Sequence, residues 1–464
     1  MRYVSTRGRA PVLGFDDVLL AGLATDGGLY VPEAWPRFGA TEIAALARLS
    51  YPALAAKIIA PFVAGSVLER ELPALLTKAY STFNHTAVAP LVQLDANDWL
   101  VELFHGPTLA FKDYALQVVG LMFERVIAAR GGRMTIVGAT SGDTGSAAIE
   151  ACRGRANIDV FILHPAGRTS EVQRRQMTTV DAANVHNIAI AGTFDDCQDL
   201  VKAMFADLKL RQELNLSAVN SINWARIMAQ IVYYFWSAVQ VGAPHRPVAF
   251  AVPTGNFGNV FAGYGASRMG LPVAKFVVGS NSNDILTRYF ETAAMTTEGV
   301  APTLSPSMDI QVSSNFERLL FEAYDRDAAA VTRLMEQFKQ SGRYTVADSA
   351  HRAIAGQFVG RRLDDVGTKR TMADIYAATG LLIDPHTAVG LHAGRAAGLD
   401  PDIARLTLAT AHPAKFPDAV IAATGVRPEL PPQLADLFNR TERFTPLAND
   451  LDALKRFVRE RITP

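Results

Sequence analysis

The chain has 464 residues, of which 49% are hydrophobic and 19% charged, and its 45 lysines and arginines balance its 45 aspartates and glutamates. A chain of this length is too long to fold around a single hydrophobic core, so two or three domains are expected. A net charge of zero excludes the strongly basic surface of a nucleic-acid-binding protein and confines any anion site to a local cluster. The two cysteines, Cys152 and Cys197, cannot build a disulfide framework or a four-cysteine zinc site. We expect both to be small buried hydrophobic residues.

Residues 1–17 carry no apolar signal core, and no uncharged apolar run reaches the roughly 18 residues that a membrane helix needs. We therefore expect a soluble, cytoplasmic protein with neither a membrane nor a nucleic acid as its partner.

Residues 1–90 mix turns with helical patterns. The Asp-Gly-Gly turn of residues 26–28 precedes a short apolar run ending at Pro32. Residues 41–63 are rich in Ala and Leu and predict a helix interrupted near Pro52. The segment contains no alternating strands and helices.

From about residue 90 strands alternate with helices, which predicts mostly parallel sheets covered on both faces. Residues 133–154 and 247–270 each predict a strand, a Gly-rich loop and a helix, and further strands are expected at 157–165, 184–192 and 274–281. Two α/β halves are therefore expected, around residues 130–200 and 245–285. Residues 290–380 predict mostly helices, and the chain ends in an amphipathic helix. The expected division is an N-terminal segment (1–90), a region of two α/β halves (91–430) and a helical tail (431–464).

TGNFGN, residues 254–259, follows an apolar strand and opens a helix. Gly255 and Gly258 let the backbone approach an anion closely, and the free N–H groups of a helix start attract phosphate. An ordinary strand-to-helix turn that needs glycine for its φ angles has the same pattern, and the loop alone does not decide between them.

ATSGDTGSA, residues 139–147, occupies the same position in the other half. Its hydroxyl groups and helix-start N–H groups suit a carboxylate or a phosphate, but on spacing alone the simpler explanation is that Ser141, Asp143 or Thr144 caps the helix. NSINWAR, residues 220–226, offers Asn220, Ser221 and Arg226. An arginine grips phosphate or carboxylate with two hydrogen bonds, although a surface arginine in a loop remains the simpler explanation.

Lys112 stands in HGPTLAFKDYALQ, residues 105–117, between a Gly-Pro loop and an apolar helix. Most lysines are surface residues. The combination of a phosphate-sized loop, a carboxylate-sized loop and a lysine among small residues is nevertheless what a pyridoxal phosphate enzyme needs, because the amine binds the cofactor covalently.

These motifs resemble the threonine synthase family of fold-type II pyridoxal phosphate enzymes, which have a tryptophan synthase β-like fold. The opening segments YVSTRG and GLATDGGLYVP are similar to the start of that family, and FKD, TSGDTG, NSINWARI, PTGNFGN and TAHPAKF match it in order along nearly the whole chain. The resemblance implies pyridoxal 5′-phosphate as cofactor and Lys112 as the Schiff-base lysine.

The resemblance also implies roles for the other motifs. Thr410 would offer its hydroxyl to the pyridine nitrogen, and Asp143 would lie beside the 3-hydroxyl of the ring, which an ionised carboxylate would repel. The cofactor phosphate would lie against Gly255, Asn256, Phe257, Gly258 and Asn259. The substrate carboxylate would be bound by Thr140, Ser141 and Thr144, and the substrate phosphate by Asn220, Ser221 and Arg226.

The implied reaction converts O-phospho-L-homoserine and water to L-threonine and phosphate, in a monomer or homodimer. Two alternatives share the fold: a serine/threonine dehydratase-like lyase, and a cofactor-binding relative without catalysis. TGNFGN replaces the run of four glycines usual in the dehydratases. The joint presence of Lys112, Thr410 and Arg226 argues against a non-catalytic relative. No role is predicted for Lys415, which could anchor its loop or reach an anion.

Overall fold

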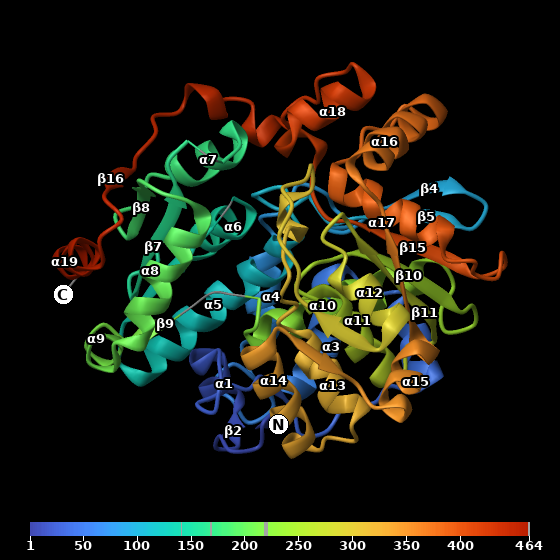
Figure 1. The fold of residues 1–464 in the computed structure, drawn as a ribbon, viewed down its shortest axis with the longest axis horizontal. Coiled ribbons are helices and arrows are strands. Elements are labelled where there is room, and N and C mark those ends of the chain that lie inside the picture. Colours follow the sequence, from blue (N-terminus) through green and yellow to red (C-terminus); the bar gives the residue numbers. More distant parts are fainter. Residues whose placement is uncertain (141, 168, 218–220, 463–464) are drawn as a thin grey trace.

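The computed structural model describes residues 1–140, 142–167, 169–217 and 221–462, and it consists of two α/β halves resting on an N-terminal segment (Figure 1). The smaller half lies at the left of Figure 1 and the larger at the right. The two predicted halves with mostly parallel sheets are thereby confirmed.

The larger half is built on a six-stranded sheet. Its strands pair in the order β14 (Phe358–Arg362), β11 (Val273–Ser280), β10 (Val248–Pro253), β15 (Ala404–Ala409), β5 (Asp98–Glu102) and β4 (Leu91–Asp95). Every neighbouring pair is parallel except β4 and β5. The carboxyl ends of β10 and β15 therefore share one edge, which brings the loops after residues 253 and 409 together.

The smaller half has a five-stranded parallel sheet in the order β16 (Thr445–Leu447), β8 (Val185–Ile190), β7 (Ile158–Pro165), β6 (Met134–Ala139) and β9 (Leu216–Ser217). Every residue of β7 is buried, as expected of an apolar, β-branched strand inside a parallel sheet. The strand β16 comes from the last residues of the chain, and α19 (Leu451–Arg461) packs beside α8 (Phe194–Ala206). The C-terminal tail is therefore part of this half.

Helix α5 (Lys112–Arg130) connects the two halves, because it packs against α6 (Asp143–Cys152) on one side and α10 (Trp224–Gln240) on the other. Gly120 permits the contact with α6, since a Cβ at this position would collide with the carbonyl of Ala151. Residues 112–123 of α5 and all of α10 except Gln240 are buried, in keeping with their apolar sequences.

The N-terminal segment contributes the small sheet β2-β1-β3 and four helices that pack beneath α5 and α10. The interruption expected near Pro52 is real: α2 ends at Leu46, and Pro52 lies in the first turn of α3, where its missing N–H costs nothing. The elements are β1 (Arg2–Ser5), β2 (Leu13–Gly14), α1 (Phe15–Ala21), β3 (Tyr30–Pro32), α2 (Ala40–Leu46), α3 (Tyr51–Val63) and α4 (Leu72–Tyr80).

The remaining helices cover the sheets or link them, and β12 pairs with β13 in a two-stranded sheet. The helices are α7 (Glu171–Thr178), α9 (Leu208–Glu213), α11 (Gly258–Arg268), α12 (Ile285–Thr292), α13 (Phe316–Ala323), α14 (Ala328–Ser341), α15 (Asp348–Gln357), α16 (Asp365–Thr379), α17 (Pro385–Ala396) and α18 (Pro417–Thr424). The two strands are β12 (Ala294–Thr296) and β13 (Arg343–Thr345). Short 3-10 turns occur at η1 (Pro306–Met308), η2 (Pro413–Lys415), η3 (Pro432–Leu434) and η4 (Leu437–Asn439). None of the described helices is both long and apolar enough to cross a membrane.

Candidate active site

Lys112 begins helix α5 and is buried where the two halves meet. Its Nζ lies 3.3 Å from Asp143 Oδ2 and 5.6 Å from the centre of the Phe111 ring. Burial lowers the pKa of Lys112, the negative charge of Asp143 opposes this, and the positive charges of Lys415 and Arg226 lower the pKa further. A buried amine whose proton is weakened in this way is suited to chemistry rather than to a surface role.

The loop before Lys112 is held in place by Asp113. Its carboxylate accepts hydrogen bonds from the Thr108 backbone N–H at 2.8 Å and from the Thr108 hydroxyl at 2.7 Å. Burial raises the pKa of Asp113 to about 7. On the other side of Lys112, the N–H of Phe111 donates to the carbonyl of Thr410 at 2.9 Å. Hydrogen bonds made by both sequence neighbours of Lys112 therefore hold its backbone in place.

Asp143 is the first residue of α6 and makes contacts with residues from four other elements or loops. Its Oδ1 lies 2.9 Å from Lys415 Nζ and accepts from Gln173 Nε2 at 2.9 Å, while its Oδ2 faces Lys112 and accepts from the Ser307 hydroxyl at 3.3 Å. Burial would raise the pKa of Asp143, but Lys112 and Lys415 hold it well below its usual range. Gln173 and Ser307 belong to no recognisable motif, and only the fold brings these two polar residues to Asp143.

The TGNFGN loop connects β10 to α11 as predicted. Phe257 adopts a left-handed φ of 60°, and α11 begins at Gly258 without a side-chain cap. Within the described parts of the chain, no group accepts a hydrogen bond from the backbone N–H groups of residues 255–259. These donors at a helix start form a ready anion site.

Asn259 adds a further unpaired donor to this loop. Its Oδ1 accepts hydrogen bonds from the hydroxyls of Tyr233 at 2.6 Å and Tyr234 at 2.9 Å, which fixes the amide. Its Nδ2 is buried and has no partner among the described residues. Because a buried polar group without a partner is costly, this donor fits an acceptor supplied by a bound molecule.

Arg226 lies in the first turn of α10 and is also buried. Its Nε and one terminal nitrogen have no hydrogen-bond partner in the described part of the chain, and burial lowers its pKa to about 10. The simple explanation of a surface arginine is therefore wrong. Of its predicted neighbours, Ser221 is half-buried in the turn before α10, and Asn220 lies outside the described residues.

The ATSGDTGSA loop joins β6 to α6. The Thr140 hydroxyl oxygen accepts from the N–H groups of Gly142 at 3.0 Å and Gly145 at 2.9 Å, so it shapes the loop and keeps only its own proton to donate. Thr144 is half-buried, and Ser141 lies outside the described residues. Thr410 follows β15 and is buried, and its hydroxyl makes no hydrogen bond to any described residue.

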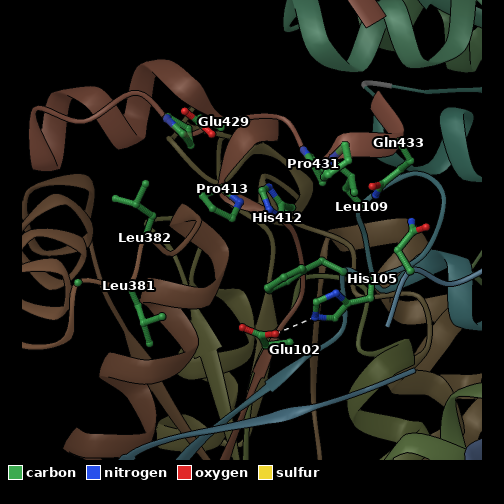
Figure 2. A pocket seen from close by; sticks show the side chains of 15 residues that line it. Glu102, His105, Leu109, Leu381, Leu382, His412, Pro413, Glu429, Pro431 and Gln433 are labelled. Carbon is green, nitrogen blue, oxygen red and sulfur yellow. Dashed lines mark hydrogen bonds and ion pairs between the residues drawn. The ribbon is translucent and has the colours of Figure 1, made fainter. Parts of the chain in front are cut away.

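A separate pocket of about 520 Å³ is lined by residues from the segments 102–109, 380–382, 412–413 and 428–433 (Figure 2). Leu109, His412 and Pro413 form part of its wall, and His105 Nε2 lies within hydrogen-bonding distance, 2.7 Å, of Glu102 Oε2. Lys112 does not line it. Among the described residues, no group of three or more His, Cys, Asp or Glu side chains could hold a metal ion.

The unpaired groups fit a phosphorylated cofactor attached to Lys112. Among the described residues, the loop N–H groups, Asn259 Nδ2 and two nitrogens of the Arg226 guanidinium are donors without acceptors, and Lys112 is a buried amine with a lowered pKa. One phosphate at the α11 start and a second anion at Arg226 would satisfy them.

Family models match almost the entire chain. Residues 2–80 match the threonine synthase N terminus, residues 83–337 the pyridoxal-phosphate dependent enzymes, and residues 387–458 the threonine synthase C-terminal region. A threonine synthase of Pseudomonas aeruginosa is 56% identical over 99% of this chain and 98% of its own length.

Solved structures agree with these matches. The PLP-bound threonine synthase of Brucella melitensis superposes with a TM-score of 0.97 at 55% identity and covers 99% of both chains. The yeast threonine synthase superposes with a TM-score of 0.94 at 39% identity, covering 99% of this chain and 98% of its own.

Proposed function

The chain belongs to the threonine synthase family of pyridoxal phosphate-dependent enzymes, and we propose that its substrate is O-phospho-L-homoserine, with Lys112 as the residue that carries the cofactor and moves the protons. The observations that support this most strongly are the burial of Lys112 and the burial of Arg226, two of whose guanidinium nitrogens have no partner among the described residues. The reaction converts O-phospho-L-homoserine and water to L-threonine and phosphate, so one C–O bond to phosphate breaks and one C–O bond to water forms.

The cofactor site is proposed to comprise the loop at residues 254–259, Thr410 and Asp143. The unpaired N–H groups and Asn259 Nδ2 would bind the cofactor phosphate. The Thr410 hydroxyl would hydrogen-bond the ring nitrogen, which a neutral partner leaves largely unprotonated. Bound pyridoxal 5′-phosphate withdraws electrons from the substrate amino acid, and this makes the protons on its Cα and Cβ acidic.

Lys112 is proposed as the base. With the substrate bound, Lys112 would be a free primary amine beside the substrate Cα. Its surroundings lower its pKa, so it can accept a proton near neutral pH. Protons must move at Cα, Cβ and Cγ, and a single flexible amine can reach all three carbons.

Arg226 and Ser221, together with Asn220, are proposed to bind the substrate phosphate, and Thr140, Ser141 and Thr144 the substrate carboxylate. The phosphate leaves with more negative charge than it carries in the substrate, so a fixed guanidinium stabilises the transition state more than the ground state.

We further propose a cytoplasmic monomer or homodimer in which residues 1–90 form a supporting segment, residues 91–430 the catalytic region and residues 431–464 a tail. Size-exclusion chromatography with light scattering would measure the subunit number.

An absorbance spectrum combined with a phosphate-release assay tests the proposed function. We expect a visible cofactor band that borohydride removes by fixing the cofactor to Lys112, and equal amounts of phosphate and threonine from O-phospho-L-homoserine. A band without phosphate release would instead indicate a dehydratase-like lyase or a non-catalytic relative. Absence of a band after adding pyridoxal 5′-phosphate would exclude Lys112 from the role.

A further inference from the structure

Lys415 is a second buried lysine beside Lys112, and the reaction described above assigns it no role. It ends the short turn η2, and its side chain is fully buried. Its Nζ donates to the Thr108 carbonyl at 2.6 Å and lies 2.9 Å from Asp143 Oδ1. Because a buried ammonium is tolerated only when it is paired and hydrogen-bonded, these two partners account for its position.

The Asp143 carboxylate is shared unequally between the two lysines. On Oδ1 it holds Lys415 and Gln173, both at 2.9 Å. On Oδ2 it faces Lys112 and Ser307, both at 3.3 Å. The Asp143 carboxylate therefore interacts more closely with Lys415 than with Lys112.

The charges of this cluster do not balance when both lysines are protonated. One carboxylate then faces two ammonium groups, and the three groups together carry one net positive charge in a buried site. Loss of a proton from one lysine makes the cluster neutral, which a low-dielectric interior favours. Lys415 has two close partners and Lys112 has one longer contact, so Lys112 is the lysine that loses the proton.

Of the other charged groups around the cluster, Asp113 is only partly ionised near neutral pH, so it offsets this excess only in part. Arg226 on α10 adds a further positive charge that lowers the pKa of Lys112. His386 on α17 pairs with Asp384 at 2.7 Å, and its Nε2 accepts from the Ser307 N–H at 3.3 Å. Asp113 on α5 is held by Thr108, and burial raises its pKa to about 7.

We propose that Lys415 is the permanent cationic partner of Asp143 and that it thereby lets the Lys112 amine lose its proton near neutral pH. Lys415 is a positioning residue in this role, because it acts on Lys112 through Asp143. The inference rests on the proposed function, since the proton on Lys112 matters only if Lys112 carries the cofactor.

Two steps depend on this proton. Only the neutral amine attacks the aldehyde carbon of pyridoxal 5′-phosphate: a C–N bond forms, and the carbonyl oxygen leaves as water with the two amine hydrogens. The neutral amine is also the form that acts as a base towards the substrate. Without Lys415, Asp143 would pair with Lys112 alone and hold its proton.

The test follows the ionisation of Lys112 directly, in the full-length chain freed of cofactor. Trace acetylation with acetic anhydride between about pH 6 and 10, followed by peptide mass spectrometry, reports how the reactivity of Lys112 depends on pH. The rate at which added pyridoxal 5′-phosphate develops its absorbance band is the second readout. In Lys415→Met we expect the Lys112 profile to move to higher pH by about one unit, and both rates at pH 7 to fall about tenfold.

Two variants serve as controls. Lys415→Arg keeps the positive charge and should restore most of the wild-type profile. Arg405→Met is matched to Lys415→Met, because Asp98 is likewise shared by two cations, Arg405 at 3.0 Å and Arg395 at 2.9 Å, away from Lys112. This variant should leave the Lys112 profile unchanged.

An unchanged Lys112 profile in Lys415→Met would overturn the inference. If Lys415→Met does not fold, Asp143→Asn is the second test. Removing the carboxylate should move the pH profile of Lys112 acetylation to lower pH. A profile that stays in place or moves to higher pH would overturn the inference. Peptide mapping separates the two proposals. Wild-type protein that binds no cofactor at Lys112 refutes the proposed function together with the inference, whereas normal attachment with an unchanged profile in Lys415→Met refutes only the inference.

Discussion

Replacing Arg226 by methionine tests whether this buried guanidinium serves the substrate phosphate rather than the fold. Burial lowers the pKa of Arg226 from 12.5 to about 10, and its Nε lacks a described partner. This lowering of the pKa corresponds to roughly 3 kcal/mol by which the buried surroundings destabilise the charged form of Arg226. Arg226→Met removes that cost with a side chain of similar shape, so we expect the substrate-free protein to unfold at the same or a higher temperature.

Substrate binding should change in the opposite direction, because the substrate phosphate needs the positive charge that the substrate-free interior disfavours. A hydrogen bond between charged groups contributes about 1.5–3 kcal/mol, so the KM for O-phospho-L-homoserine should rise about ten- to hundredfold. Steady-state kinetics measures this, and thermal unfolding with and without inorganic phosphate measures the stability.

Arg318→Met is the matched control for Arg226→Met. Arg318 is equally buried, but it donates to the carbonyls of Tyr30 at 3.0 Å and Ile222 at 2.6 Å and to the side chain of Asn315. Its loss should therefore lower the unfolding temperature. The reasoning is refuted if Arg226→Met lowers the unfolding temperature as Arg318→Met does and leaves KM unchanged.

The other predictions concern the cofactor site and its pH dependence. Lys112→Ala should lower kcat by at least about a thousandfold and remove the borohydride-sensitive band, with an unchanged far-ultraviolet circular dichroism spectrum; residual turnover near the wild-type rate would contradict its role. Thr410→Ala should shift the cofactor spectrum while KM changes less than about threefold, because its hydroxyl is proposed to contact the ring and not the substrate. Gly255→Ala should weaken cofactor affinity at least about tenfold in a titration, since the new Cβ would lie 2.9 Å from Ile310 Cγ1 in a loop that must approach the phosphate. Asp113→Asn should flatten the pH dependence of stability. The folded-state pKa of Asp113 is raised from 3.8 to about 7, so the folded protein binds the proton more tightly, and the free energy of unfolding falls by up to roughly 4 kcal/mol as pH rises between these values. Urea midpoints of both proteins at about pH 5 and pH 8 measure this, and equal slopes would contradict it.

The parts of the fold that were predictable are those with local patterns. The strands β6, β7, β10 and β11 lie where apolar, β-branched runs predicted them, because strands buried on both faces need such residues. Strand β14 lies within a stretch expected to be mostly helical, and β16 lies in the expected helical tail. Both are short, and both form by pairing with β11 and β8, which are distant in sequence, so no local pattern marks them.

The site was predictable in its motifs but not in its contacts. A lysine, a Gly-rich loop and an arginine can be recognised one by one, yet their sequence leaves open whether they are exposed. The decisive facts are the burial of Lys112 and Arg226 and the absence of described partners for Arg226 Nε. These facts depend on the packing of α5 and α10 between the two halves, which arises from contacts across the whole chain.

Asp143 and Lys415 each carry a charge that would be unfavourable in this site on its own, so their effects have to be considered together. An ionised carboxylate beside the cofactor 3-oxygen would repel it, and a lysine with no exposed surface would bear an unpaired charge. The fold brings the two within 2.9 Å, so each compensates the charge of the other before any cofactor binds. The pair is then a neutral dipole next to Lys112, which removes the net repulsion expected from Asp143 alone. In the proposed site, two charged residues would thus provide the cofactor with a neutral partner, and the amine of Lys112 would be the group whose proton moves.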